Sequence, residues 1–305
     1  MSVAEIRGLT VKYGQFTAVD NFDLTLPEGC VGLLGPNGAG KTTFLKTLLG
    51  FITPAAGGGT VLGMDIATQG AAIRQQIGYM PEQDCHIPGN TAVQFVSYAG
   101  ELAGLPHNRA LQRAHEVLEY CGLGEARYRN VETYSTGMKQ RIKLAQALVH
   151  GPKLLLLDEP TNGLDPRGRE EMLSLVRDIS TKKGLSVLVC SHLLPDIERT
   201  CEEVIVLLGG KLQAQGPIRD LKSMTGEPLD VELRETSGEF LMRADQLGLR
   251  LLHTKGSVYR LQGEGTRLEN CRSVYEAAKR SQSQVRAVRL AERSLEEAFL
   301  EVVGG

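Results

Sequence analysis

The sequence predicts an α/β protein built on a mostly parallel sheet, and three observations lead to this prediction. Strand-like and helix-like stretches alternate along the chain as far as Leu208. A phosphate-binding loop, residues 35–43, lies between an apolar run, residues 31–34, and the start of a helical apolar pattern. A second apolar run, residues 154–157, ends in two carboxylates, and ligands bind beyond such strand ends in open parallel sheets. The fold class and a ligand site at one edge of the sheet are therefore predicted together.

The composition is that of an ordinary globular protein. The chain has 305 residues, of which 42% are hydrophobic and 23% charged, and its formal net charge is -2. No basic block occurs, so binding to nucleic acid is not expected. The six cysteines form no C-x-x-C pair and are predicted to be mostly small buried thiols. There is no secretion-signal pattern and the longest apolar runs are of strand length, so we expect a soluble protein that only another chain could hold at a membrane.

The N-terminal residues are expected to form an antiparallel part of the sheet. A strand begins with residues 6–11, the chain turns at Tyr13 and Gly14, and apolar residues alternate with polar ones over residues 22–26. Tyr13 lies just outside the first strand and either caps the sheet or stacks on a purine base.

The phosphate-binding loop fits G-x-x-x-x-G-K-[ST] at every fixed position. Its glycines let backbone N–H groups curl around an anion, and the helix that follows adds a favourable dipole. Lys41 can reach the β- and γ-phosphates of a nucleotide, and the Thr42 hydroxyl can bind Mg²⁺. The predicted nucleotide-binding residues of the loop are Gly35, Pro36, Asn37, Gly38, Ala39, Gly40, Lys41, Thr42 and Thr43.

Beyond the first helix, the chain is expected to return to short strands. A glycine-rich turn at residues 57–59 precedes strands near residues 60–62 and 77–80. Pro81 ends the second of these strands, and Gln83 follows in a loop.

A helical insertion is predicted next, over about residues 84–150. Thr91 and Gln94 form a capping box at the start of one helix. Apolar residues from 110 to 121 fall on one face of another helix, which Gly122 ends.

Polar residues at strand ends and helix starts complete the first part of the chain. Ser135 is placed to cap a helix, and Asp165 caps another that has proline in its first turn. Asp158 and Glu159 follow the apolar strand and are therefore expected beside the phosphate loop. His192 lies at the end of another buried strand.

The last part of the chain is predicted to be a small α+β domain. Gly216 and Pro217 mark the boundary, which gives domains of residues 1–216 and 217–305. The element order β-α-β-β-α-β suggests a ferredoxin-like fold. No catalytic constellation occurs there, so we interpret this domain as a folding or interaction module. Strands are expected over residues 229–233, 251–253, 258–261 and 285–290, and helices over about 239–247, 274–279 and after Ser294.

Residues 1–216 resemble the ATP-binding cassette of ABC transporters. The specific element is residues 135–141 (Ser-Thr-Gly-Met-Lys-Gln-Arg), which are similar to the ABC signature and lie just upstream of the second apolar strand. Gln83, Asp165 and His192 follow in the order that this family shows. The resemblance implies a P-loop NTPase of the ABC type, with a mixed sheet and a helical insertion.

The resemblance also implies ATP and Mg²⁺ as ligands and gives roles to the site residues. Asp158 would hold Mg²⁺, and Thr42 and Gln83 would complete its coordination. Glu159 would orient or deprotonate the attacking water, and His192 would contact the γ-phosphate. Gln83 is counted with these two as a catalytic residue.

The family further implies that two cassettes share each ATP. Ser135, Thr136 and Gly137 would act on ATP held by a second chain, and Asp165 would belong to a loop at the dimer interface. Thr136 stands where the family usually has glycine, and Met138 where it often has glutamine. The threonine adds a Cβ near the phosphate approach. A homodimer, or a heterodimer of cassettes, is expected on ATP binding.

One cassette, no membrane span and a C-terminal extension resemble the separate ATPase subunits of ABC exporters. The resemblance implies that the chain powers a polytopic membrane permease, and that it lies in the cytoplasm against the inner face of the membrane. Export is favoured over import, and residues 84–130 are expected to contact the permease. The alternative is a soluble ABC protein that acts on a macromolecular partner such as the ribosome or DNA. Such proteins usually carry two cassettes or a long coiled coil, and this sequence has neither.

Overall fold

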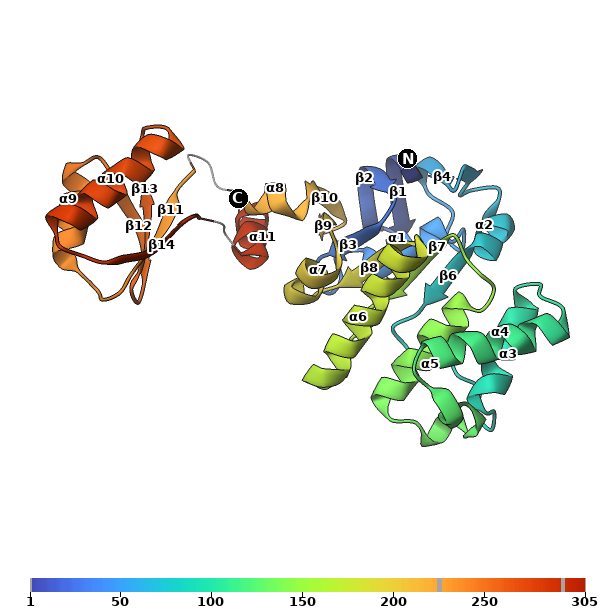
Figure 1. Cartoon of the computed structure of the whole chain (residues 1–305). Coiled ribbons are helices and arrows are strands. Elements are labelled where there is room, and N and C mark those ends of the chain that lie inside the picture. The colour runs from blue at the N-terminus through green and yellow to red at the C-terminus, as the bar shows by residue number, and fades with distance from the viewer. Residues whose placement is uncertain (1, 224–226, 292–293, 305) are drawn as a thin grey trace. The chain divides into compact units, whose positions relative to one another are not determined.

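The computed structural model describes residues 2–223, 227–291 and 294–304 (Figure 1). The chain divides into two compact units, residues 1–218 with 301–305, and residues 219–300. Each unit has its own hydrophobic core. No helix among the described residues is long and apolar enough to cross a membrane.

The central sheet of the first unit has six strands, and five of them are parallel. In spatial order these are β10 (Lys211–Pro217), β9 (Glu203–Leu208), β3 (Cys30–Leu34), β8 (Ser186–Ser191), β7 (Leu154–Asp158) and β6 (Ile77–Met80). β10 is the antiparallel strand at the edge. Every residue of β3, β7 and β8 is buried, which explains why these strands are apolar except at their ends. The predicted mostly parallel sheet is confirmed.

A second, antiparallel sheet is formed by the N-terminal part of the unit. Its strands, in order, are β2 (Phe16–Pro27), β1 (Ser2–Tyr13), β4 (Ala56–Val61) and β5 (Met64–Asp65). Residues 57–59, predicted as a turn, lie inside β4, so that prediction was wrong. A Cβ on Gly59 would lie 2.2 Å from the carbonyl oxygen of Glu5, which shows that glycine is required there by the close approach of β1.

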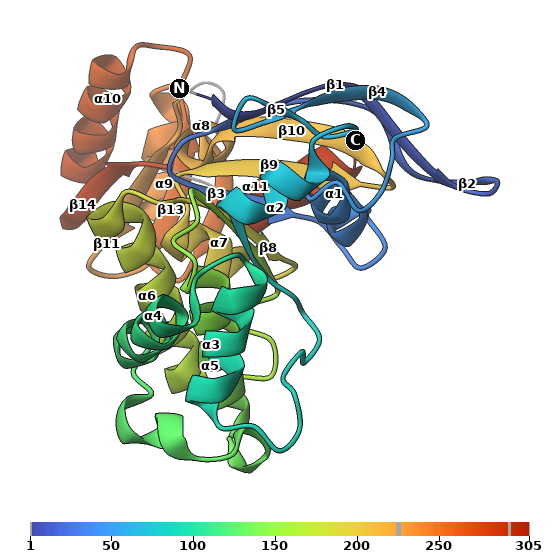
Figure 2. The same cartoon turned by 90° about the vertical axis from the view of Figure 1, so that its right-hand side faces the viewer.

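Helices of the first unit connect these strands or pack beside them (Figures 1 and 2). Strands are connected by α1 (Lys41–Leu48), α2 (Gly70–Gln76), α6 (Pro166–Lys183) and α7 (Leu194–Thr200). The predicted helical insertion consists of α3 (Ala92–Leu102), α4 (His107–Tyr120) and α5 (Thr136–Leu148), which pack on one another. It also contains short 3₁₀ turns at Gly124–Tyr128 and Val131–Thr133. The capping box of Thr91 and Gln94 is present at the start of α3. One core joins α1 to both sheets, where Phe44 packs edge-on against Phe22.

The second unit has the predicted β-α-β-β-α-β order. Its elements are β11 (Leu229–Leu233), α9 (Gly238–Gln246), β12 (Arg250–Lys255), β13 (Val258–Gln262), α10 (Arg267–Arg280) and β14 (Val285–Leu290). The antiparallel sheet has the order β12-β13-β11-β14, so β11 and β13 lie in its centre. α8 (Ile218–Lys222) precedes this sheet, and α11 (Leu295–Gly304) follows it with the predicted cap, in which Ser294 Oγ accepts from the N–H of Glu297 at 3.1 Å.

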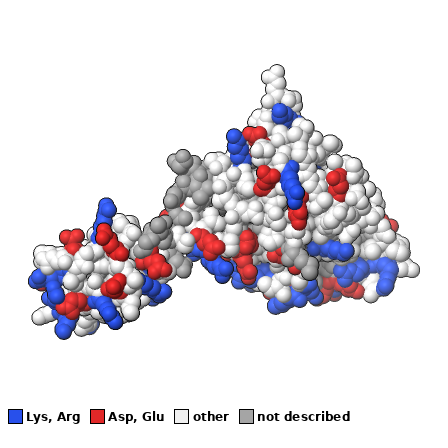
Figure 3. Space-filling model, turned by 90° about the horizontal axis from the view of Figure 1, so that it is seen from above, with Lys and Arg blue, Asp and Glu red and all other residues white. Residues whose placement is uncertain are grey.

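Most of the cysteines are buried, as the sequence predicted. All six cysteines are free, and Cys30, Cys121, Cys190 and Cys201 are buried, whereas Cys85 is exposed. Basic and acidic side chains are interspersed on the face shown in Figure 3.

Candidate functional site

The phosphate loop connects β3 to α1, and its backbone requires glycine at two positions. Gly40 has φ 101°, and a Cβ there would lie 2.5 Å from the carbonyl oxygen of Ala18. A Cβ on Gly35 would lie 2.5 Å from the carbonyl oxygen of Leu207. These close contacts fix the loop at the N-terminus of α1, where the helix dipole favours an anion.

The cation and the hydroxyl at the start of α1 each face one of the two carboxylates. Lys41 is only 7% exposed. Its Nζ donates to the carbonyl of Gly35 at 2.6 Å and lies 3.7 Å from Oε1 of Glu159. The Thr42 hydroxyl donates to Oδ2 of Asp158 at 3.1 Å. The predicted proximity of the loop and the carboxylates is therefore present.

Asp158, the last residue of β7, is a desolvated carboxylate. Burial raises its pKa above the usual 3.8, and the negative charges of Glu82 and Glu159 act in the same direction. The hydrogen bond from Thr42 and the charge of Lys41 oppose this rise. A divalent cation would favour the ionised form of Asp158. The carboxylate of Asp158 and the hydroxyl of Thr42 are both oxygen ligands of the kind that Mg²⁺ accepts together with phosphate and water. The residues present therefore fit a Mg²⁺ ion.

Glu159 has a strained backbone that turns its side chain toward the end of β8. Its φ is 51°, in the left-handed region, which costs a residue with a Cβ about 1–3 kcal/mol. The strain is held by its N–H, which donates to the carbonyl of Cys190 at 2.9 Å. Oε1 accepts from the backbone N–H of His192 at 3.1 Å, and Oε2 lies 2.9 Å from Nδ1 of that histidine. The neighbours Asp158 and Glu159 thus face different partners.

A cavity of about 430 Å³ brings most of the predicted residues together. Among the residues predicted to act on ATP held by this chain, Gly35, Gln83 and His192 do not line the cavity. Gln83 is exposed, and its neighbour Glu82 lines the cavity. Both residues lie in a bend after β6, and a difference of one position decides which side chain faces the site. The described residues that line the cavity are Tyr13, Phe16, Ala18, Pro36, Asn37, Gly38, Ala39, Gly40, Lys41, Thr42, Thr43, Glu82, Asp158 and Glu159.

Two exposed aromatic side chains form the rim of the cavity. Tyr13 is 51% and Phe16 is 64% exposed, and the two residues are cross-strand partners at the turn between β1 and β2. Tyr13 therefore does not cover the core. The sequence analysis missed Phe16, although a tight two-residue turn after Tyr13 would have placed these rings side by side.

The signature residues 135–137 lie at the N-terminus of α5 and do not line the cavity of their own chain. Ser135 caps α5 as predicted, because its Oγ accepts from the N–H of Met138 at 3.4 Å. Asp165 likewise caps α6, and its Oδ1 accepts from the N–H of Gly168 at 3.1 Å.

Two polar side chains of α5, missed in the sequence, tie this helix to the loops of the site. Lys143 is 1% exposed and donates to the carbonyls of Pro81 at 3.0 Å and Glu82 at 2.7 Å, and burial lowers its pKa. Gln140 donates to the carbonyl of Asn162 at 2.9 Å. The sequence indicated Gln140 only as part of the signature, and neither contact could be found from it, because lysine and glutamine are usual on exposed helix faces.

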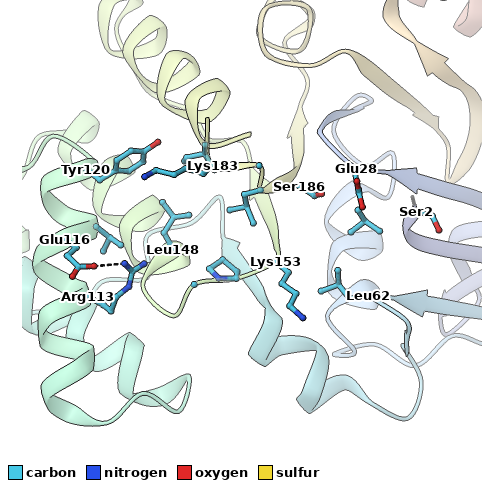
Figure 4. Close-up of a pocket in the computed structure, with 17 residues that line it drawn as sticks. Ser2, Glu28, Leu62, Arg113, Glu116, Tyr120, Leu148, Lys153, Lys183 and Ser186 are labelled. Carbon is cyan, nitrogen blue, oxygen red and sulfur yellow. Dashed lines mark hydrogen bonds and ion pairs between the residues drawn. The ribbon is translucent and has the colours of Figure 1, made fainter. Parts of the chain in front are cut away.

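A larger cavity of about 850 Å³ lies at the opposite ends of β7 and β8 (Figure 4). Leu148 lines it, and on one side Arg113 is paired with Glu116 at 2.6 Å. No residue predicted for the nucleotide site lines this cavity. The functional site is therefore identified by its chemistry and not by its size.

Comparisons with known proteins identify a family of similar chains. Residues 19–162 match the protein family described as ABC transporter. The chain is 41% identical over 218 residues to the uncharacterised ABC transporter ATP-binding protein YxlF of Bacillus subtilis (strain 168), which covers 71% of this chain and 72% of that protein. It is 33% identical over 309 residues to the daunorubicin/doxorubicin resistance ATP-binding protein DrrA of Streptomyces peucetius, covering 98% of this chain and 92% of the relative. Among solved structures, the dimeric post-hydrolysis state of the ATP-binding cassette MJ0796 bound to ADP and Pi matches with a TM-score of 0.65 and 25% identity, over 71% of this chain and 99% of that one.

Proposed function

Because the chain belongs to the family of ABC transporter ATP-binding proteins, we propose that it powers export through a separate membrane permease. The chain is the ATP-binding subunit of such a transporter and an ATPase. The observation that carries export is the similarity to DrrA along nearly the whole chain, the second unit included, since the name of that relative describes drug resistance.

ATP would bind with its phosphates in the loop of residues 35–43 and its base against the aromatic rim. The loop supplies the N-terminus of α1 and the ammonium group of Lys41. Tyr13 and Phe16 offer exposed rings on which a purine can stack. A stacked base requires no hydrogen-bond readout, so this rim would hold the nucleotide in place without strict selection of the base.

Thr42 and Asp158 would hold Mg²⁺, and Glu82 would lie beside it in the position that the sequence analysis gave to Gln83. When bound, Mg²⁺ would supply positive charge that offsets the charge developing on the phosphoryl group. The chain itself contributes the carboxylate of Asp158, which burial has already deprived of solvent.

Glu159 would orient the attacking water and accept its proton, while His192 keeps that carboxylate in place. The contacts that support these roles are the hydrogen bond from the His192 N–H and the short Nδ1–Oε2 distance. Lys41 would neutralise the phosphate charge on the other side.

The second cassette needed to complete the site would be another copy of the chain or a related chain. Residues 135–137 lie outside the cavity of their own chain, which supports a role toward ATP in the partner. The Asp165 loop, packed near this signature, would lie at the same interface, since a Cβ on Gly163 would be only 3.2 Å from Thr136 Cγ2.

Purification of the tagged chain from solubilised membranes tests the proposed partner. A polytopic membrane protein should accompany the chain, and a Lys41→Ala variant should retain it, because assembly with a permease does not require hydrolysis. Recovery of ribosomes or DNA in its place would contradict the transport function and favour an ABC protein that acts on a macromolecule. Attachment of the chain to the cytoplasmic face of the membrane rests on the same result.

A further inference from the structure

Asp196 is a buried charged residue that the roles above do not use. It lies on α7, four residues after His192, and is 2% exposed. Its Oδ2 accepts from the hydroxyl of Thr161 at 2.5 Å, and its Oδ1 lies 2.7 Å from Nε of Arg169. A buried carboxylate is unfavourable unless it is paired in this way, so the three side chains act as one unit, the Asp196 cluster.

Each member of the Asp196 cluster belongs to a segment that carries a residue of the site. Thr161 is 3% exposed and lies two residues after Glu159. Arg169 lies in the first turn of α6, and its N–H donates to the carbonyl of the capping residue Asp165 at 2.9 Å. Asp196 itself lies in the helix that follows His192. The cluster therefore joins the three segments that contain the water-positioning carboxylate, the dimer loop and the histidine.

His192 lies on a junction that is too short to move independently. β8 ends at Ser191 and α7 begins at Leu194. One end of this junction is fixed by the pairing of β8 with its neighbours, and the other by the Asp196 cluster. A small shift of α7 would therefore change the position of the imidazole relative to Glu159.

We propose that Asp196 is a positioning residue for ATP hydrolysis, which makes His192 and the Asp165 loop move together. The inference rests on the roles proposed above for Glu159 and His192. No member of the Asp196 cluster lines the nucleotide cavity, so its loss should slow hydrolysis without weakening ATP binding.

A second ion pair between the same two helices provides a matched control. Arg199 Nη1 lies 3.0 Å from Oε1 of Glu170, and the two side chains are 58% and 65% exposed. This pair also joins α7 to α6, but both of its side chains are exposed and neither belongs to the Asp196 cluster. An exposed pair contributes little free energy, so its removal should leave hydrolysis unchanged.

The experiment compares Thr161→Val, which keeps the shape of the side chain but removes the hydroxyl, with Thr161→Ser, which keeps the hydroxyl. Asp196→Asn is the second variant, because it can still accept from Thr161 but has no charge for Arg169. Each is assayed as the full chain with ATP and Mg²⁺, at a temperature well below its unfolding midpoint. We expect kcat to fall about tenfold in Thr161→Val and Asp196→Asn, with KM and ATP affinity within about twofold of wild type. Thr161→Ser and Arg199→Gln should hydrolyse ATP at the wild-type rate.

Hydrogen exchange gives a readout that does not depend on turnover. In Thr161→Val, exchange should increase together over residues 160–166 and 191–197, while Arg199→Gln should change neither segment. Wild-type kcat in both Thr161→Val and Asp196→Asn, a parallel loss of ATP affinity, or an equal loss in Arg199→Gln would each overturn the inference. His192→Ala distinguishes failure of the Asp196 inference from failure of the proposed role of His192. If His192→Ala slows hydrolysis but the variants of the Asp196 cluster do not, only the Asp196 inference is wrong. If His192→Ala has no effect, the proposed role of His192 is wrong.

Discussion

At the scale of single residues, Lys41 is the cation on which phosphate binding depends. Lys41→Ala should lower the rate of ATP hydrolysis about 100-fold, which corresponds to about 3 kcal/mol of lost charge stabilisation in a closed site. Lys46→Ala is the matched control, because Lys46 lies on the same helix α1 but is exposed. A steady-state assay of both variants checks this prediction, and near-normal turnover of Lys41→Ala would remove the basis for the phosphate-loop assignment.

Glu82 and Gln83 offer a direct test of which side chain faces the metal. Only Glu82 lines the cavity, and its charge contributes to the raised pKa of Asp158. Glu82→Gln should therefore increase the Mg²⁺ concentration required for half-maximal hydrolysis several-fold, whereas Gln83→Ala should leave it unchanged. The opposite result, a change in Gln83→Ala alone, would restore the assignment made from the sequence.

Asp158 should make the metal-free protein less stable as the pH rises. Because burial raises its pKa, the folded chain binds the proton of this carboxyl more tightly than the unfolded chain does. The free energy of unfolding of the wild type therefore decreases as the pH rises from about 3.8 through the pKa of the folded state. In Asp158→Asn this pH-dependent decrease should be absent, because the amide does not ionise. Denaturant unfolding at several pH values in a chelator should show Asp158→Asn gaining stability relative to wild type over this range. A constant difference between the two proteins would mean that Asp158 is not desolvated.

At the scale of elements, local sequence signals predicted the strands and caps of the first unit well. Capping residues such as Thr91, Ser135 and Asp165 reveal helix starts because their side chains bond to the helix itself. The start of α10 was missed by seven residues, although Thr266 and Glu269 form a capping box there. The predicted turn at residues 57–59 was wrong because glycine occurs both in turns and where another backbone approaches closely. The sequence alone does not distinguish these two cases, since the distinction depends on the neighbouring strand β1.

The residues of the site could be predicted from the sequence only where they belong to a local motif. The phosphate loop and the residues Asp158 and Glu159 are local motifs, so their chemistry was apparent in the sequence. Contacts such as those of Lys143 with the loop after β6 join residues that are far apart in the chain. No local pattern encodes such contacts, and the fold must be known before they can be seen.

The helical insertion carries the element-scale prediction. Tyr98 and Leu102 on α3 are 47% and 71% exposed, and large exposed apolar side chains are typical of protein interfaces. In complex with the permease, residues 84–130 should become protected from hydrogen exchange, and Leu102→Glu should weaken the complex. Leu268→Glu is the control, since Leu268 is 63% exposed but lies in the second unit. Protection confined to residues 219–300 would place the permease contact elsewhere.

At the scale of the whole molecule, ATP should hold two chains together. If each ATP lies between Lys41 of one chain and Ser135 of another, nucleotide binding and association are linked. Glu159→Gln keeps the shape of the side chain but removes the base, so ATP should persist and a dimer should accumulate with ATP and Mg²⁺. The wild type, which hydrolyses its ATP, should remain largely monomeric or dimerise only transiently.

Light scattering after size exclusion measures this association. Adding Ser135→Arg to Glu159→Gln should return the protein to a monomer, because the longer side chain occupies the proposed contact with the partner. A Glu159→Gln chain that stays monomeric at saturating ATP would contradict the shared site. Equal dimerisation without nucleotide would assign the interface to another part of the chain.

The order of strands in the central sheet also has a consequence for synthesis and folding. β3, which leads into the phosphate loop, pairs with β8, and about 155 residues separate partners such as Val31 and Leu188. Since ribosomes add about 5–20 residues per second, β3 is made on the order of ten seconds before the strand that covers it. During this interval its apolar residues need protection from aggregation, and closing so long a loop makes folding intrinsically slow. Since Gly35 of the phosphate loop lies against the carbonyl of Leu207, ATP can stabilise the nascent chain only after β9 has left the ribosome, so nucleotide binding follows the formation of the central sheet rather than nucleating it.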